Sequence, residues 1–168
     1  MIQSEQNRGF TLIELMVVIS LISIMLFFSM PRFQNTIITD SKRSTARWII
    51  GKVRVLKERS ARNQKLYILH VNMDTNRLWT SNGAMSEEDL QSAQQKGYEI
   101  PGDLKVQNVE YPEKGIISFG QADICFYSKG YSDKALIHIQ DDDGKMSFLI
   151  EPFLPKVKMY EKYVGFED

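Results

Sequence analysis

Hydrophobic and polar positions divide the chain into regions of different periodicity. A mostly apolar run extends from Phe10 to Met30, 21 residues in which Glu14 is the only charged side chain. A helix of that length would reach about 31 Å, which is the hydrocarbon thickness of a bilayer. A charged side chain at helix depth in a bilayer costs about 2.5–3.5 kcal/mol on insertion scales, so Glu14 should have a partner. The run therefore predicts a membrane span, and the function of the protein should explain which group pairs with the one carboxylate in it.

Beyond Pro31 the apolar positions keep a helical spacing. One mostly apolar stripe recurs at steps of three, four and seven, and consists of Ile38, Thr45, Ile49, Val53, Leu56 and Ser60, widened by Trp48 and Ala61. The basic residues largely occupy the other faces. We expect one long helix from about Phe10 to Arg62, with a membrane half and an amphipathic half. Because proline lacks a donor and clashes with the preceding turn, Pro31 predicts a kink or local melting near Phe27–Met30.

After the helix the period changes to two, which indicates strands. The segments "KLYILHVNM" and "RLWTSN" predict a β-hairpin. Ser86, followed by three acidic residues, is a candidate N-cap for a short helix or ordered loop. Five further strands are expected in "LKVQNVEY", "GIISFG", "DICFYSKG", "KALIHIQ" and "KMSFLIEPF". The pattern predicts an α+β protein, an antiparallel meander packed on the helical stem, and it assigns no structure to the tail from Leu154.

Charge is unevenly distributed although the formal net charge is zero. Between Asp40 and Lys65 nine basic residues face two acidic ones, whereas from Leu66 to the end seventeen acidic residues outnumber ten basic ones. One interpretation is a solvated helix face followed by an acidic domain. The other is electrostatic docking, in which the basic stem of one copy meets the acidic domain of another.

Few residues suggest catalysis or metal binding. His70 and His138 each lie in a strand pattern with no metal-ligand spacing, and no glycine-rich phosphate loop occurs. Two histidines alone do not argue for a Ser/His/Asp arrangement. Asp141–Gly144 is an acidic cluster, but Asp-Gly between two apolar strands first indicates a hairpin turn, and the calcium-loop spacing is missing. Cys125 is the only cysteine and is expected to be a small buried hydrophobe. We therefore expect no enzyme, no cofactor and no metal.

The N-terminus does not have the order of a removable secretory signal, because a short polar leader precedes the apolar run and no small-residue cleavage site follows it. The run should therefore remain as an anchor. By the positive-inside rule, Arg32, Lys42, Arg43 and Arg47 would place the globular part in the cytoplasm.

The stretch "RGFTLIELMVVISLI" resembles the N-terminus of type IV pilins and type II secretion pseudopilins. The resemblance implies cleavage by a prepilin peptidase between Gly9 and Phe10, methylation of the new amino terminus at Phe10, and an assembly ion pair through Glu14. Pro31 matches a proline that is typical near the end of the span. It also implies the topology opposite to the charge rule: a single-pass inner-membrane protein with its C-terminal domain in the periplasm. A simple membrane anchor whose Glu14 reaches the interface is the competing interpretation.

The rest of the chain resembles, more loosely, the GspH/FimT-type minor pseudopilins and pilins, on "ARWIIGKVRVLKERSARNQKLYILHVNMDTNRLWTSN" and on the late "ISFGQADICFYSKG" and "GKMSFLIEP" segments. The implied fold is a pilin fold with a leader at 1–9, a transmembrane and assembly helix at 10–32, an amphipathic stem at 33–64 and a β-rich domain at 65–168.

The implied function is a minor pseudopilin near the tip of a periplasmic type II secretion pseudopilus. The alternative is a FimT-like minor type IV pilin in pilus assembly or DNA uptake. Expected partners are other pseudopilins, the prepilin peptidase, the inner-membrane assembly platform, the lipid bilayer and secreted cargo. Nucleic acid is less favoured, because the basic stripe is on a stem that assembly would bury.

Overall fold

The computed structural model describes residues 11–142 and 144–166, and for 26–39 it describes the backbone alone. The chain divides into two compact units, residues 1–39 and 40–168, which are treated separately below. Helix α1, Leu12–Asn63, contributes to both units. Its extent confirms the predicted long helix within two residues at each end.

Helix α1 ends where the backbone reverses its handedness. Gln64 follows the last helical residue with φ at +53°, the left-handed conformation in which many helices stop. Its side-chain amide donates a hydrogen bond to the carbonyl oxygen of Ala61, which satisfies one of the carbonyls left open at a helix C-terminus. Arg62 adds a favourable cation to this last turn.

The first sheet contains the predicted hairpin. Strands β1 (Tyr67–Asn72) and β2 (Arg77–Asn82) pair antiparallel in register from Tyr67↔Asn82 to Asn72↔Arg77. The short strand β3 (Tyr98–Glu99) lies beside β2, and β6 (Gln121–Phe126) pairs with the free edge of β1. The order is therefore β3-β2-β1-β6, with every pairing antiparallel.

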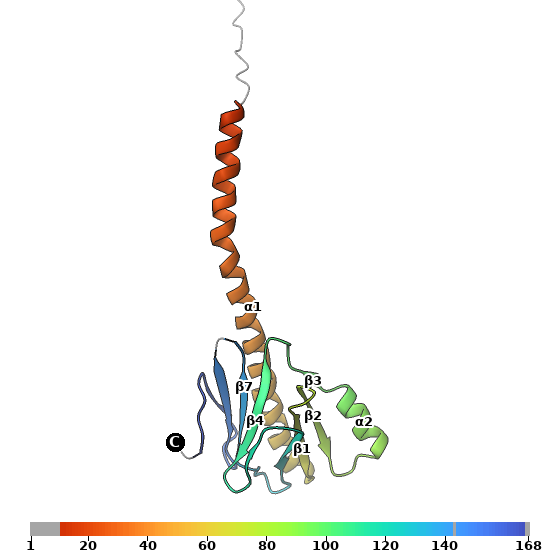
Figure 1. Ribbon diagram of the computed structural model, residues 1–168. Helices are drawn as coiled ribbons and strands as arrows, with labels where there is room; N and C mark the ends of the chain where they lie inside the picture. Colours follow the sequence, from red (N-terminus) through yellow and green to blue (C-terminus); the bar gives the residue numbers. More distant parts are fainter. Residues whose placement is uncertain (1–10, 143, 167–168) are drawn as a thin grey trace, which may run out of the picture. The chain divides into compact units, whose positions relative to one another are not determined.

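The second sheet has five antiparallel strands in the order β5-β4-β7-β8-β9. They are β4 (Lys105–Tyr111), β5 (Gly115–Ile117), β7 (Ala135–Gln140), β8 (Lys145–Ile150) and β9 (Lys158–Tyr160). Five consecutive residues of β7 are buried, as expected of a central strand covered on both faces. Figure 1 shows β4 and β7 side by side in this sheet.

The predicted single meander is wrong, because β6 leaves the chain order and joins the first sheet. Its pairing with β1 extends over six residues, from Tyr67↔Phe126 to Asn72↔Gln121. Alternation within β6 predicts a strand with one covered face, but it does not say which edge that strand will join. Strands β3 and β9 were not predicted either, because both are short edge strands with too few residues for an alternating pattern to be recognised.

The core of the second unit joins both sheets to the C-terminal part of α1. Ile49, Val53 and Leu56 are at most 2% exposed and belong to the same apolar cluster as β1, β4, β6, β7 and β8. The polar members of the predicted stripe, Thr45 and Ser60, are fully buried as well. The predicted packing of the stem on the strands is therefore confirmed.

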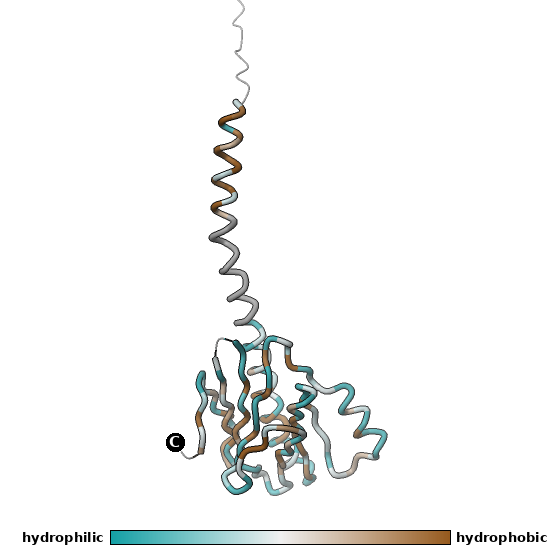
Figure 2. The backbone as a smooth tube through the Cα atoms, in the orientation of Figure 1, coloured by the Kyte–Doolittle hydropathy of each residue, from teal (hydrophilic) through white to brown (hydrophobic). Residues whose placement is uncertain are grey.

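Two details of the helical stripe differ from the prediction. Ala61 is exposed, whereas Ala46, which was not assigned to the stripe, is buried. Lys57, expected on a solvated face, is also buried. Figure 2 shows hydrophobic positions of the strands interleaved with polar ones, as half-buried strands require.

The polar segment after β2 forms the short helix α2 (Glu87–Gln95). Ser86 is its N-cap, as predicted. The Ser86 side chain accepts a hydrogen bond from the Asp89 N–H, and the Asp89 carboxylate accepts one from the Ser86 N–H, so the two residues form a capping box. Helix α2 lies beside β2 at the edge of the first sheet (Figure 1).

Candidate functional site

The described part of the N-terminal segment begins with a helix cap at Thr11. The backbone N–H of Glu14 donates a 3.3 Å hydrogen bond to the Thr11 hydroxyl, and the N–H of Leu15 donates to the Thr11 carbonyl oxygen. Glu14 is thus the third residue of the helix, where a carboxylate interacts favourably with the positive end of the helix dipole. The spacing Thr-x-x-Glu is a capping signal, and it could have located this helix start from the sequence.

Apolar side chains cover the first turns of α1 on every side. Between Leu12 and Met25 their exposed fractions range from 43% for Val18 to 75% for Leu12, and Figure 2 shows the same apolar stretch along the tube. The hydroxyls of Ser20 and Ser23 donate to the carbonyl oxygens four residues before them, so these polar groups need no external partner. An exposed apolar surface of this extent indicates a site of contact with a membrane or with other apolar protein surfaces.

Glu14 is the exposed charge on this apolar surface. Its predicted counter-charge, the amine of Phe10, belongs to residues outside those described, as does Gly9. The backbone of α1 is helical through Phe27–Met30 and at Pro31, so the alternative of local melting was wrong, and the kink at Pro31 stays a prediction. Across the described residues, no helix combines the length and apolar character needed to cross a membrane.

Lys57 has a role that its sequence context did not indicate. Its ammonium group donates hydrogen bonds to the carbonyl oxygens of Glu151, Pro152 and Leu154, which follow β8. Burial lowers the pKa of Lys57, and the neighbouring Glu151 carboxylate opposes that shift. Lys57 therefore fastens the loop after β8 to helix α1.

His70 lies in a hydrogen-bonded row with Ser81 and Asp123, an arrangement not predicted from the sequence. Its Nδ1 is 2.7 Å from Asp123 Oδ1, and its Nε2 is 2.7 Å from the Ser81 hydroxyl. The hydrogen bond from His70 lowers the pKa of the Asp123 carboxyl. The Trp79 ring stacks on the imidazole at 5.1 Å.

In the row of Ser81, His70 and Asp123, the hydroxyl is buried and the carboxylate is partly exposed, which is the opposite of what nucleophilic catalysis needs. Ser81, which would attack a substrate, is 5% exposed, whereas the Asp123 side chain is 45% exposed. A catalytic hydroxyl must reach the substrate while the carboxylate orients the histidine from behind. The row therefore ties three strands of the first sheet together, consistent with the expectation of histidines on a strand face.

His138 occupies a second polar cluster, in the other sheet. Its Nδ1 is hydrogen-bonded to the Ser147 hydroxyl at 2.9 Å, its Nε2 lies 3.5 Å from Glu110 Oε2, and Tyr163 stacks on its ring. Ser147 in turn donates to the carbonyl oxygen of Lys162. Burial lowers the pKa of His138, and Glu110 only partly offsets this effect. The cluster fixes the tail, for which no structure was predicted, against the second sheet.

The turn at Asp141 closes the hairpin between β7 and β8, as predicted. The Gly144 N–H donates to the Asp141 carboxylate at 2.7 Å, and Lys42 of α1 forms an ion pair with Asp141 at 2.5 Å. The carboxylate is thus engaged by the protein itself. Within residues 11–142 and 144–166, no three potential metal ligands gather at one place.

Cys125 is half-buried, whereas a small buried hydrophobe was predicted. It lies on the outer side of β6, because Ala122, Ile124 and Phe126 occupy the core side. Burial raises the pKa of its thiol.

Comparison with known proteins identifies one feature of the chain. The family model of the prokaryotic N-terminal methylation motif matches residues 6–30. No curated protein and no solved structure matches the chain significantly.

The segment that the family model matches contains Gly9, Phe10 and Glu14, the residues singled out from the sequence. The motif is typical of membrane-anchored pilin-like proteins that a prepilin peptidase processes and that assemble with other pilins. The chain thus carries the N-terminal motif of a type IV pilin-like structural subunit, on an α+β fold of helix and antiparallel sheets consistent with that class.

Proposed function

We propose that this protein is a GspH/FimT-like minor pseudopilin of a type II secretion system, a structural subunit near the tip of a periplasmic pseudopilus. The observation that carries the proposal is the register of Gly9, Phe10 and Glu14 within the methylation motif. The exposed apolar surface of α1 between Leu12 and Met25 supports it, because such a surface suits both a bilayer and a filament of packed helices.

In this proposal the Glu14 carboxylate selects subunits for assembly. Cleavage after Gly9 would create an α-ammonium on Phe10, one helical turn from Glu14. An unpaired charge in apolar surroundings is costly, whereas a matched ion pair removes that cost. A neighbouring subunit that supplies the ammonium group would therefore draw Glu14 out of the bilayer and into the filament.

The second candidate function is a minor type IV pilin in pilus assembly or DNA uptake. It shares the N-terminal motif, and exposed basic residues on α1, among them Arg54, Arg59 and Arg62, are chemically suited to phosphate contacts. The genes beside this one distinguish the two candidates. A secretion ATPase and secretin of the type II set favour the pseudopilin, and competence genes favour the pilin.

Mass spectrometry of the protein recovered from its native membrane tests the processing step. We expect a chain that has lost Met1–Gly9 and carries a methyl group on Phe10. An intact leader on all recovered protein would overturn the proposal.

Substitution of Glu14 tests the assembly step. Glu14→Gln should leave membrane association unchanged and reduce recovery of the protein in sheared filaments at least tenfold. Glu58→Gln is the matched control, since it removes an exposed carboxylate elsewhere on the same helix and should have no effect. Equal recovery of both variants would remove the ion-pair argument.

A further inference from the structure

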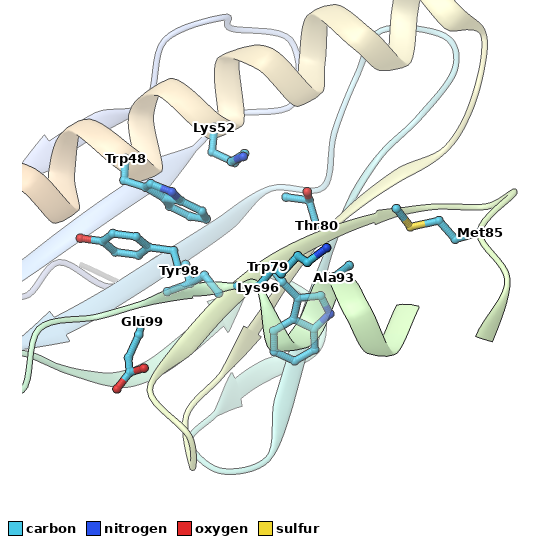
Figure 3. Close-up of a pocket in the computed structure, with 11 residues that line it drawn as sticks. Trp48, Lys52, Trp79, Thr80, Met85, Ala93, Lys96, Tyr98 and Glu99 are labelled. Carbon is cyan, nitrogen blue, oxygen red and sulfur yellow. The ribbon is translucent and has the colours of Figure 1, made fainter. Parts of the chain in front are cut away.

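A hollow of about 550 Å³ lies in the second unit, between α1, β2 and the end of α2 (Figure 3). Trp48 and Lys52 extend into it from α1, Trp79 and Thr80 belong to β2, and Lys96 follows α2. Because side chains from three elements converge, this is a built concavity and not a gap along one helix.

Aromatic rings give the hollow a rigid wall. Trp48 stacks on Tyr98 with ring centroids 4.6 Å apart and planes 17° from parallel. The Tyr98 hydroxyl is hydrogen-bonded to the buried hydroxyl of Thr45 at 3.1 Å, which fixes the ring pair to α1. Aromatic surface that is already ordered loses little conformational entropy when a partner binds.

Two lysines, Lys52 and Lys96, line the hollow together with one carboxylate, that of Glu99. Lys52 lies over the Trp48 ring at 5.3 Å, and its ammonium has no carboxylate partner among the described residues. Lys96 is exposed and likewise forms no ion pair within residues 11–142 and 144–166. The carboxylate that lines the hollow, Glu99, is paired with Arg77 at 2.7 Å and extends away from Trp48 in Figure 3. Two ammonium groups are therefore available to an anionic partner.

The first turn of α2 offers the complementary surface. Helix α2 buries none of its residues, and Leu90 is 37% exposed. Asp89 is used by the capping box, whereas Glu87 and Glu88 form no hydrogen bond or ion pair through their side chains in the described part of the chain. This turn therefore presents two free carboxylates beside an aliphatic side chain, and these groups match the two ammonium groups and the aromatic wall.

We propose that the hollow receives the first turn of α2 from a second copy of this chain. Glu87 and Glu88 of one copy pair with Lys52 and Lys96 of the next, and Leu90 packs on the aromatic wall. The two α2 helices meet end to end, so that the positive N-terminal end of one approaches the negative C-terminal end of the other. Such a contact joins two different surfaces, so repeated contacts of this kind build a ring where the rotation closes and an open row where it does not. The proposal rests on the proposed function only in requiring that copies become neighbours.

Intrinsic fluorescence reports directly on this hollow, because Trp48 and Trp79 are the only tryptophans of the chain and both line it. The full chain in detergent micelles is titrated with a synthetic peptide of residues 84–95. We expect a saturable change in tryptophan emission. Lys52→Glu combined with Lys96→Glu should weaken peptide binding at least tenfold, and Lys129→Glu with Lys156→Glu, two exposed lysines elsewhere, should leave it unchanged.

A charge exchange makes the test specific. A peptide carrying Glu87→Lys and Glu88→Lys should bind the wild-type chain at least tenfold more weakly and should recover binding to the Lys52→Glu/Lys96→Glu variant. No saturable change with the wild-type pair, or no recovery after the exchange, would overturn the proposal. Tighter saturable binding of oligothymidylate than of the peptide would also overturn it and would identify a nucleic-acid site. The titration needs no processing or filament, so its failure leaves the cleavage test untouched, and an intact leader leaves the titration untouched.

Discussion

The ammonium group of Lys57 donates a 2.6 Å hydrogen bond to the carbonyl oxygen of Leu154, 97 residues further along the chain. The same group also contacts the carbonyls of Glu151 and Pro152. One side chain of α1 thus satisfies three backbone carbonyls of the loop after β8. Directly after Pro152 the chain presents Phe153, whose side chain is 80% exposed, so the clamp orders a segment that buries little apolar surface of its own.

Lys57→Met should lower the free energy of unfolding by about 2–3 kcal/mol, because it removes charge-assisted hydrogen bonds from a buried ammonium group to three backbone carbonyls. Urea denaturation followed by tryptophan fluorescence measures this. Arg54→Met is the matched control, since Arg54 is exposed on the same helix and its replacement should change stability by less than about 0.5 kcal/mol. Equal effects of the two substitutions would contradict the clamp.

Asn76 should be the most sensitive position of the β1–β2 turn. Its φ is +52°, its amide donates to the carbonyl oxygen of Leu104 at 2.7 Å, and its side-chain oxygen accepts from the Val106 N–H at 2.9 Å. Asn76→Ala loses these bonds and also strains the backbone, so we expect a loss of about 2–4 kcal/mol. Asn76→Gly relieves the strain alone and should lose about 1 kcal/mol less. Thermal unfolding of both variants distinguishes the two contributions, and identical losses would exclude the backbone effect.

Removal of the Thr11 cap should loosen the first turn of α1. Thr11→Val deletes the hydroxyl that accepts from the Glu14 N–H and should cost about 1 kcal/mol of local helix stability. Hydrogen exchange of the Glu14 amide should accelerate about fivefold, whereas Thr11→Ser should leave the rate near that of the wild type. Unchanged exchange in Thr11→Val would show that the cap contributes nothing.

The stability of the second unit should fall as the pH is lowered through the range in which histidine titrates. Burial lowers the pKa of His138 in the folded chain, so the unfolded chain binds more protons near pH 6. The stabilisation is complete above about pH 6.5, the unfolded value, and decreases towards the lower folded pKa at up to about 1.4 kcal/mol per pH unit.

His138→Gln should flatten this slope between pH 7 and pH 5, as measured by urea midpoints. Asp123 also has a lowered pKa, but its contribution is present above about pH 4 and is lost only below that value, so it does not interfere. A slope that persists in His138→Gln would assign the pH dependence to another group.

Local patterns predicted the elements better than their partners. The spacing of Ile49, Val53 and Leu56 located the buried face of α1, and Ser86 located the start of α2, because both signals act over one or two helical turns. Which edge β6 joins depends on contacts about fifty residues away, and nothing within "DICFYSKG" encodes that choice. The role of Lys57 was missed for the same reason, since its acceptors are backbone carbonyls that carry no sequence signal.

The candidate site could be predicted where its residues lie close together in the sequence. The methylation motif lies within residues 6–30, and the residues selected from the sequence lie inside it. The row of Ser81, His70 and Asp123 was not predictable, because three strands bring these residues together. The hollow beside Trp48 likewise depends on β2, β3 and α2 meeting one helix.

The buried stripe of α1 has a mechanical consequence. A force applied along the backbone of this helix in the second unit would act on Ile49, Val53 and Leu56, which belong to one apolar cluster with residues of both sheets. Sliding the helix out would uncover all three side chains and break the Lys57 clamp in the same movement, so the load is shared by many contacts at once. Pulling on this part of α1 would therefore load the apolar stripe and the Lys57 clamp of the second unit together, and not one strand at a time.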